Sequence, residues 1–308
     1  MSSTDQAVRP VTGEQYEIRH GTVRAVATEV GAGLREFEVD GIAYLHSFPT
    51  HQLPPFGAGT LLAPWPNRVA DGRWTLDGEP QQLALTEPAR HNAIHGLLRQ
   101  ASWEVVERQE TRIELAAWVN AQAGWPVPLR VAVVYEVGAD GLTITHTATN
   151  VGDRRSPFGV ASHPFPRAGN TPTLDCTLTL PAATVLPVDE RLLPTGPAEP
   201  VDGTDFDFRA GRLLRGVTLD TAFGGCMPDE SGLVRHRLLG PDGSGVEVWA
   251  EPVFKWVQVF TPEDLGGNGP AVAIEAMTCP PDALNSGVDL IWLEPGESWR
   301  GSWGVRPV

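Results

Sequence analysis

The chain has 308 residues, of which 41% are hydrophobic, and a formal net charge of −15 at pH 7. This length allows one large domain or two ordinary ones, and the hydrophobic content is sufficient for a sizeable core. The acidic balance argues against a nucleic acid or a membrane surface as partner, because both require clustered lysine and arginine. No apolar run reaches the roughly 18 residues that a membrane-spanning helix needs.

The cysteines and the N-terminal residues bear on the cellular compartment. The three cysteines, Cys176, Cys226 and Cys279, are odd in number, far apart and without a C-x-x-C pair. This pattern predicts reduced thiols rather than a disulfide framework. The opening segment "MSSTDQAVRPVTGEQ" contains no apolar stretch typical of a secretory signal. We therefore expect a soluble, cytoplasmic protein, as a monomer or a homodimer.

Short apolar segments, separated by turn residues, follow one another along the chain. "LREFEVDGIAYLH" and "GRWTLDGEPQQLAL" each place an Asp-Gly turn, at Asp40 and Asp77, between two alternating segments. "SWEVVERQETRIELAAWV", "LRVAVVYEVGADGLTITHTATN", with its turn at residues 138–141, and "LLGPDGSGVEVWAE" repeat the pattern. No long amphipathic helix is evident. The sequence predicts an all-β protein with a large antiparallel sheet.

The loosest segment runs from Pro194 to Gly211, "PTGPAEPVDGTDFDFRAG". No charge run or low-complexity tract marks a domain boundary there. We interpret the segment as a long surface loop within a single domain that spans residues 1–308. A linker between two domains is the alternative.

Two of the eight histidines, His91 and His95, lie four residues apart in "RHNAIHGLLR". On a helix this spacing could hold a metal ion. The preceding "EPAR" and the following Gly96 leave room only for a short helix, and no H-E-x-x-H pattern is present, so we expect no metal site. Two interpretations remain: a turn histidine bonded to backbone, or His95 pointing into a cleft where Gly96 lets the backbone approach a ligand.

Two further segments carry side chains suited to a binding site. In "APWPNRVADGRW", prolines stiffen the loop that presents Asn67 and Arg68, and the arginine fork suits ligand oxygens. In "FGVASHPFPRAG", Pro164 holds His163 in an extended conformation between two phenylalanines. Partial desolvation there favours a neutral imidazole unless a carboxylate faces it. The alternatives are a surface arginine and a buried histidine with a satisfied hydrogen bond.

Two carboxylates occur in apolar surroundings. Glu275 lies within "AVAIEAM", and a charged side chain is rarely buried without a partner or a purpose. On the inner face of a strand it would be a candidate general base, or else half of a structural ion pair. Asp220 in "GVTLDTAFGG" could accept hydrogen bonds from sugar hydroxyls, or form a turn. The ten tryptophans could stack on sugars, but core packing is the simpler interpretation.

Five segments, "PNR", "HG", "SHPF", "LDTAF" and "IEAMTCPPDALNSG", occur in the order found in the aldose 1-epimerase (galactose mutarotase) family. The chain resembles that family over essentially its whole length. The resemblance implies a large antiparallel β-sandwich, the galactose mutarotase-like supersandwich, with its active site in an open cleft. Carried over residue by residue, the catalytic base is Glu275, the general acid is His163 and the second active-site histidine is His95. His91 matches no catalytic position.

The resemblance also implies which residues bind the sugar. The family's arginine and aspartate correspond to Arg68 and Asp220, with Asn67 beside the arginine. Gln258, in "KWVQVFTP", lies where family members often have a glutamine near the sugar. This chain has "SHPFP" where many members continue with Tyr-Phe-Asn, so the resemblance does not determine the preferred sugar.

Ring opening and closure of a cyclic aldose suits these residue types. A base removes the proton of the anomeric hydroxyl while an acid protonates the ring oxygen, and the aldehyde then rotates and closes from the other face. We expect the two groups on opposite sides of the anomeric centre, a free aldose such as glucose or galactose as substrate, and no cofactor. Alternatives are a hexose-6-phosphate 1-epimerase, which should add basic residues, a non-catalytic carbohydrate-binding domain, and a glycosidase, which normally needs two carboxylates.

Overall fold

The structure, a computed structural model, describes residues 9–308. The expectation of no secretory signal in the opening segment falls partly on residues outside this range. Within it the regular secondary structure is almost entirely β-strand, as the alternating segments predict. The helical elements there are one four-residue helix, α1 (Ala283–Ser286), and the 3-10 turns η1 (Pro55–Gly57), η2 (Pro88–Arg90) and η3 (Thr173–Asp175). No helix in the described part of the chain is long and apolar enough to cross a membrane.

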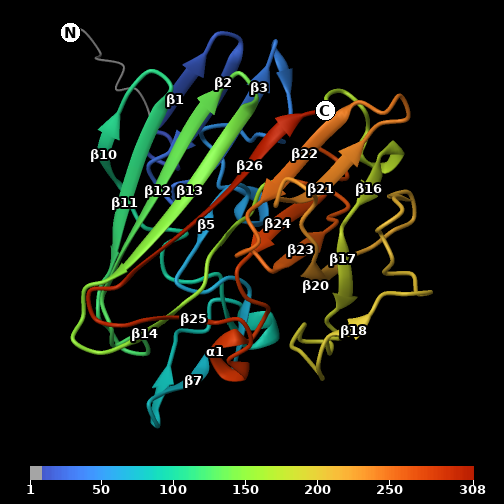
Figure 1. The fold of residues 1–308 in the computed structure, drawn as a ribbon. Coiled ribbons are helices and arrows are strands. Elements are labelled where there is room, and N and C mark those ends of the chain that lie inside the picture. Colours follow the sequence, from blue (N-terminus) through green and yellow to red (C-terminus); the bar gives the residue numbers. More distant parts are fainter. Residues whose placement is uncertain (1–8) are drawn as a thin grey trace, which may run out of the picture.

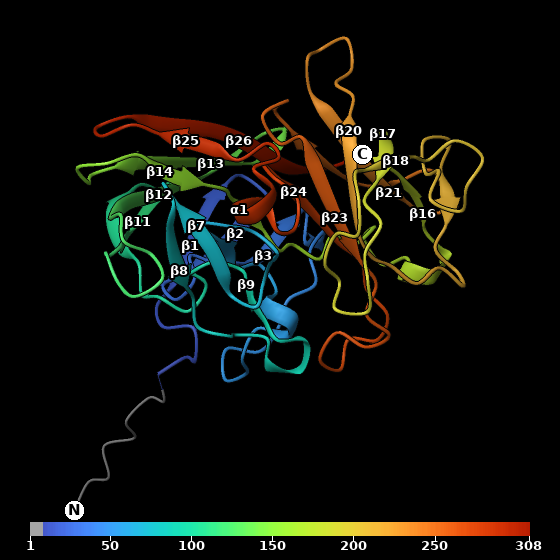
Figure 2. The same ribbon diagram turned by 90° about the horizontal axis from the view of Figure 1, so that it is seen from below.

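Two large antiparallel sheets dominate the described residues (Figures 1 and 2). The nine-stranded sheet has the order β10 (Glu104–Arg108), β11 (Arg112–Val119), β12 (Leu129–Gly138), β13 (Gly141–Asn150), β26 (Ser298–Pro307), β22 (Gly245–Ala250), β21 (Val234–Leu239), β16 (Thr177–Thr179) and β19 (Arg212–Leu213). The seven-stranded sheet has the order β18 (Glu199–Pro200), β17 (Ala182–Val185), β20 (Asp220–Cys226), β23 (Trp256–Phe260), β24 (Ala273–Met277), β15 (Ala161–Ser162) and β5 (Leu61–Leu62).

Smaller sheets complete the described fold. One has four strands, β1 (Gln15–His20), β2 (Val23–Thr28), β3 (Leu34–Val39) and β4 (Ile42–Ala43), and packs against β12 of the large sheet. Three pairs are β6 (Arg68–Ala70) with β9 (Asn92–Ile94), β7 (Arg73–Leu76) with β8 (Glu79–Gln82), and β14 (Ser156–Phe158) with β25 (Ile291–Leu293). Together they form the large antiparallel sandwich that the sequence predicts.

The predicted hairpins form where turn residues interrupt the alternation. Asp77 and Gly78 both adopt positive φ, 50° and 85°, between β7 and β8, which is the conformation that a two-residue hairpin turn requires. Along β12 the residues at every second position, from Leu129 to Val137, are buried. Each such side chain contributes roughly 1.5–3 kcal/mol by leaving water, so this alternation determines the register of the sheet.

The segment from Pro194 to Gly211 is mostly loop, as expected, and includes the short strand β18. Two of its side chains, Val201 and Phe208, are buried in the main hydrophobic cluster together with residues of both large sheets. These two anchors attach the loop to the core.

The seven-stranded sheet places three of the predicted site residues close together. Gln258 of β23 lies directly opposite Glu275 of β24. On the other side of β23, Gln258 pairs with Ala222 of β20, and Asp220 lies two residues away on the same face of that strand. Because side chains of a strand alternate between faces, these three side chains can meet above one face of the sheet.

Two histidines outside the cleft described below are fully buried in the nine-stranded sheet. The indole nitrogen of Trp303 donates to Nε2 of His146 at 2.9 Å. Burial lowers the pKa of His146 to about 3 and the pKa of His236 to about 4. A histidine in the unfolded chain titrates near 6.5. Between these values the unfolded chain therefore binds protons that the folded chain does not.

We expect the contribution of His146 and His236 to the free energy of unfolding to be fully present above pH 6.5 and to fall as the pH drops toward 4. The midpoint of urea unfolding, measured from pH 7.5 to pH 5, checks this. His146→Gln should lower stability at pH 7.5 but flatten the pH dependence, because it removes one of the titrating groups. An unchanged slope in that variant would show that His146 is not one of its sources.

Candidate active site

All seven predicted site residues line one cleft of about 410 Å³. They come from two regions of the fold, the small β6–β9 pair and the seven-stranded sheet. The cleft is lined on the first side by Asn67, Arg68 and His95, and on the second by His163, Asp220, Gln258 and Glu275. Residues up to 208 positions apart in the chain thus meet at one place.

Glu275 and His163 form the floor of this cleft. The carboxylate oxygen Oε1 of Glu275 lies 3.5 Å from Nε2 of His163, and the two residues are 1% and 4% exposed. Burial, reinforced by the negative charge of Asp220, raises the pKa of Glu275 well above its usual value. Burial also lowers the pKa of His163 to about 4. Both groups are driven toward their neutral forms, so the pair as a whole holds one proton.

Glu275 and His163, which the sequence predicts as base and acid, lie side by side, whereas the sequence reasoning expected them on opposite sides of an anomeric centre. A separation of 3.5 Å leaves no room for a sugar carbon between the two groups. The anomeric hydroxyl and the ring oxygen are bonded to the same carbon, so the groups that exchange protons with them must also be neighbours. Two phenylalanines lie near His163 in sequence. Phe165 stacks on the imidazole, with ring centroids 5.0 Å apart, whereas Phe158 packs on Trp299.

His95 is oriented by Asn67. The backbone N–H of Asn67 donates to the ring atom Nδ1 of His95 at 3.2 Å. In return, the backbone N–H of His95 donates to the backbone carbonyl of Asn67 at 2.9 Å. Burial lowers the pKa of His95 well below its usual value. Because Nδ1 accepts a hydrogen bond, the neutral ring carries its proton on Nε2. His95 is therefore a hydrogen-bond donor at Nε2 and not a cation.

Gly96 has a different role from the one expected. It adopts φ 69°, and a Cβ there would lie only 2.0 Å from the carbonyl oxygen of Ala63. The close approach that glycine permits is between two backbone segments, not between backbone and ligand. It brings the strand that ends before His95 against the loop that precedes Asn67.

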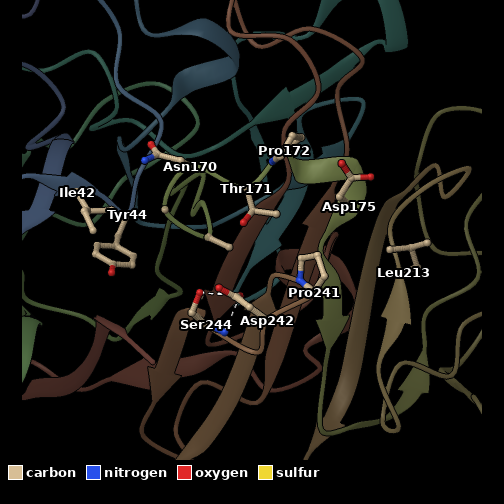
Figure 3. Close-up of a pocket in the computed structure, with 13 residues that line it drawn as sticks. Ile42, Tyr44, Asn170, Thr171, Pro172, Asp175, Leu213, Pro241, Asp242 and Ser244 are labelled. Carbon is tan, nitrogen blue, oxygen red and sulfur yellow. Dashed lines mark hydrogen bonds between the residues drawn. The ribbon is translucent and has the colours of Figure 1, made fainter.

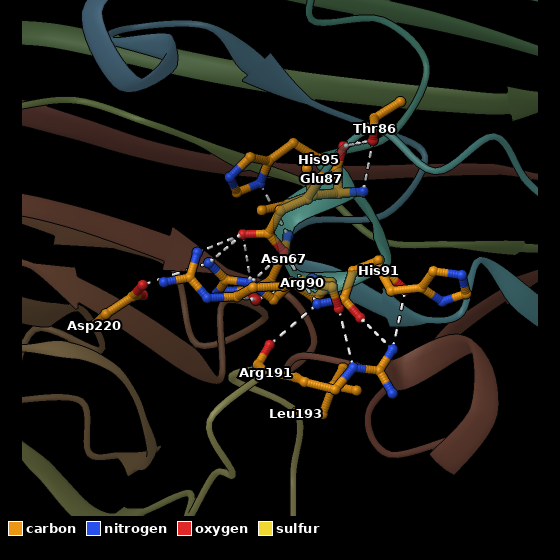
Figure 4. A network of polar contacts seen from close by, with 12 residues as sticks. Asn67, Thr86, Glu87, Arg90, His91, His95, Arg191, Leu193 and Asp220 are labelled. Atoms are coloured by element: carbon orange, nitrogen blue, oxygen red, sulfur yellow. Dashed lines mark hydrogen bonds and ion pairs between the residues drawn. The ribbon is translucent and has the colours of Figure 1, made fainter.

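Arg68 is held by a carboxylate that sequence reasoning missed. Its Nε and Nη2 donate to Glu87 at 2.9 and 3.0 Å, and Nη2 lies 3.4 Å from Asp220 (Figure 4). Asp220 in turn accepts a bond of 2.7 Å from Nε2 of Gln258. Glu87 precedes a proline in a polar loop, "LTEPARHN". Nothing in that local pattern distinguishes it from an exposed glutamate.

Two phenylalanines and a further arginine also belong to the lining. Phe56 is 54% exposed and packs edge-on against Phe260, with ring centroids 5.3 Å apart. No tryptophan lines the cleft in the described part of the chain, where the aromatic lining residues are the two phenylalanines and the two histidines, His95 and His163. Arg99, the last residue of "RHNAIHGLLR", also lines the cleft, and burial lowers its pKa.

His91 lies outside the cleft. It follows the 3-10 turn η2 with a left-handed backbone, and its exposed imidazole contacts Asp71 at 2.9 Å. His91 and His95 therefore occupy different environments, one exposed and one in the cleft. Among residues 9–308, no group of three or more His, Cys, Asp or Glu side chains is arranged to hold a metal ion.

A larger depression lies elsewhere on the surface and contains none of the predicted residues. Its volume is about 1060 Å³, and Tyr44, Asn170, Thr171 and Asp242 are among the residues that line it (Figure 3). The Asp242 carboxylate there accepts bonds from the backbone and hydroxyl of Ser244. This carboxylate caps its own turn, and no histidine is among the described residues that line the depression.

Comparison with known proteins places the chain in a family. The family model described as aldose 1-epimerase matches residues 14–306. The chain belongs to the aldose 1-epimerase family. It is 32% identical over 291 residues to the uncharacterized protein YihR of Escherichia coli K12, covering 94% of this chain and 92% of that one. It is also 32% identical over 198 residues to human galactose mutarotase, covering 61% of this chain and about half, 55%, of the mutarotase.

Solved structures of aldose epimerases share the fold. An aldose epimerase homologue from C. elegans superposes with a TM-score of 0.84 at 19% sequence identity, covering 96% of this chain and 98% of that chain. At this identity the likeness supports the β-sandwich fold and not the details of the site.

The contact at Gly96 is directly testable. Gly96→Ala should lower the free energy of unfolding by well over 1 kcal/mol, because it combines a strained backbone with a clash against Ala63. Urea unfolding measures the loss. Gly203→Ala is a matched control, since Gly203 has a similar φ of 71° and open space around it. Equal losses in the two variants would show that the clash contributes nothing.

Proposed function

We propose that this chain is an aldose 1-epimerase, a mutarotase that interconverts the α and β anomers of a free aldohexose such as glucose or galactose, without a cofactor. The observation that carries the proposal is the buried contact between Glu275 and His163 at the floor of the cleft. A carboxyl group and an imidazole that share one proton can exchange protons with two oxygens on one carbon.

The proposed cycle begins when the one proton of the neutral pair moves from Glu275 to His163, which leaves Glu275 ionised and His163 protonated. Glu275 takes the proton of the anomeric hydroxyl, His163 gives its proton to the ring oxygen, and the bond between that oxygen and the anomeric carbon breaks. Rotation of the open-chain aldehyde exposes its other face. Closure reverses both transfers and restores the starting state. Burial favours the neutral pair, which is the state that the site holds while the sugar is open.

The other lining residues would bind the sugar hydroxyls. Oε2 of Glu275 and Oε1 of Gln258 are buried and have no hydrogen-bond partner among the described residues. Buried polar atoms are normally satisfied, so these two support a polar ligand in the cleft. Arg68 and Asp220 would add a charged donor and acceptor, Asn67 would hold the backbone beside them, and His95 would donate from Nε2.

A hexose-6-phosphate 1-epimerase is the second candidate, and one observation favours it. The guanidinium of Arg99 lines the cleft without an ion-pair partner among residues 9–308. Such a group could receive a phosphate. Against this, the other two arginines of the cleft, Arg68 and Arg90, are already paired with Glu87. The near balance of charge supports an uncharged sugar.

Replacing the proposed base separates catalysis from binding. Glu275→Gln should reduce turnover by at least about 10²-fold, because the amide cannot accept a proton, while sugar affinity stays within a few-fold of native. His163→Asn should act in the same direction, and the double variant should lose less than the product of the two losses. Polarimetry of freshly dissolved α-glucose and α-galactose gives the rates, and calorimetric titration gives the affinities.

Near-native turnover of a folded Glu275→Gln protein would exclude Glu275 as the base. A native protein that binds sugar without accelerating mutarotation would instead be a carbohydrate-binding domain.

Substrate charge decides between the two candidates. We expect a higher kcat/KM for glucose than for glucose 6-phosphate, and Arg99→Gln should change the rate on glucose by less than about threefold. Steady-state rates on both sugars measure this. A preference for the phosphate ester of more than about tenfold, equivalent to roughly 1.4 kcal/mol, that disappears in Arg99→Gln would favour the second candidate.

A further inference from the structure

Arg191 lies outside the cleft, on the loop between β17 and β18 of the seven-stranded sheet. Hydrogen bonds within this loop fix its shape. The carboxylate of Asp189 accepts hydrogen bonds from the backbone N–H groups of Arg191 and Leu193, both at 2.9 Å. The Arg191 side chain therefore projects from a firmly shaped turn. This residue has no role in the proposed acid–base chemistry.

The Arg191 guanidinium forms hydrogen bonds with residues 90–92, which follow Glu87 in the chain (Figure 4). Its Nε donates to the carbonyl of Arg90 at 3.0 Å, and its Nη2 donates to the carbonyl of His91 at 3.0 Å. Nη2 also contacts the Asn92 side-chain oxygen at 3.2 Å and the Asp71 carboxylate at 2.7 Å. Three consecutive residues of one loop are thus held by a single side chain from another.

Asn92 connects Arg191 to Glu87 through hydrogen bonds. It is 0% exposed, and its Nδ2 donates to Glu87 at 3.0 Å and to the carbonyl of Arg191 at 3.1 Å. Because its oxygen faces the Arg191 guanidinium, the amide can present only its nitrogen to Glu87. The backbones of Asn92 and Glu87 are also paired, at 2.9 and 3.2 Å.

Glu87 completes the chain of contacts at the cleft. Its two oxygens receive Nε and Nη2 of Arg68 and the amide of Asn92. Because Nε and Nη2 both bind Glu87, the orientation of the Arg68 guanidinium is restrained, and Nη2 also faces Asp220. A long arginine side chain would otherwise lose considerable rotamer freedom on binding a ligand.

We propose that Arg191 is a positioning residue for Arg68, acting through Asn92 and Glu87. The inference rests on the proposed sugar-binding role of Arg68. It assigns to the β17–β18 loop a part in substrate affinity, although no atom of Arg191 lines the cleft.

The test compares Arg191→Gln with Arg209→Gln. Arg209 is a matched control, because its side chain is 32% exposed like that of Arg191, it is ion-paired with Asp202 and Asp207, and it does not line the cleft. For Arg191→Gln we expect KM for glucose and galactose to rise about fivefold, because Arg68 loses its fixed orientation for binding the sugar. The value of kcat should change less than twofold, because Arg191 takes no part in the chemical step. Arg209→Gln should be native in both. Arg191→Lys should rescue little, since an ammonium group cannot bridge three acceptors in a plane.

The decisive measurement repeats Arg191→Gln in an Arg68→Ala background. There it should cause no further rise in KM, because the residue it positions is absent. A native KM in Arg191→Gln, or an equal rise with and without Arg68, overturns the positioning role. A native KM in Arg68→Ala alone is a different failure: it removes the proposed sugar-binding role of Arg68 and with it the basis of this inference.

Discussion

The burial of Glu275 beside His163 is the constraint around which the cleft is organised. A lone carboxylate in an apolar sheet would be costly, and it would simply take up a proton. Here an imidazole with Nε2 3.5 Å away offers an alternative site for that proton. The pair can therefore hold one proton in either of two arrangements. The ring opening and closure proposed for this cleft needs this property, because each half of that reaction leaves the protons where the other half requires them.

Several neighbouring residues pack against the pair or are tied to residues beside it. Phe165 stacks on the imidazole, and Gln258, directly across from Glu275, is tied to Asp220. Asp220 is also the negative charge that helps raise the pKa of Glu275, whereas Arg68 acts against it. The positions of these two charged residues therefore bear on the proton equilibrium of the pair as well as on ligand contacts.

The opposite wall is built from loops, and loops need other means of support. Asn67 and His95 bind each other through paired hydrogen bonds, and Gly96 lets two backbones touch at Ala63. Beyond them, Arg191 secures the 90–92 segment from a separate loop. A flexible wall would have to be ordered by the ligand, at a cost in affinity. Here the polar network already orders the wall before a ligand binds.

The sequence by itself determined the fold class and predicted seven residues that the structure brings together in one cleft. Alternation along strands such as β12 and the Asp-Gly turns are local signals, because they follow from side-chain periodicity and backbone φ. Glu275 was recognisable because a charge within an apolar run is unusual at any position in a chain. The resemblance to a family then implied an active-site role for His95 and none for His91.

Only the tertiary structure decided which groups meet. That Glu275 and His163 lie side by side depends on strand pairing across the seven-stranded sheet. That Glu87 holds Arg68, or that Arg191 holds Asn92, depends on loops whose residues look like ordinary surface polar groups in sequence. Likewise, Gly96 was recognisable as a point of close approach, but its partner at Ala63 was not. Local propensity is encoded in neighbouring residues, whereas contacts between distant segments depend on how the whole chain packs.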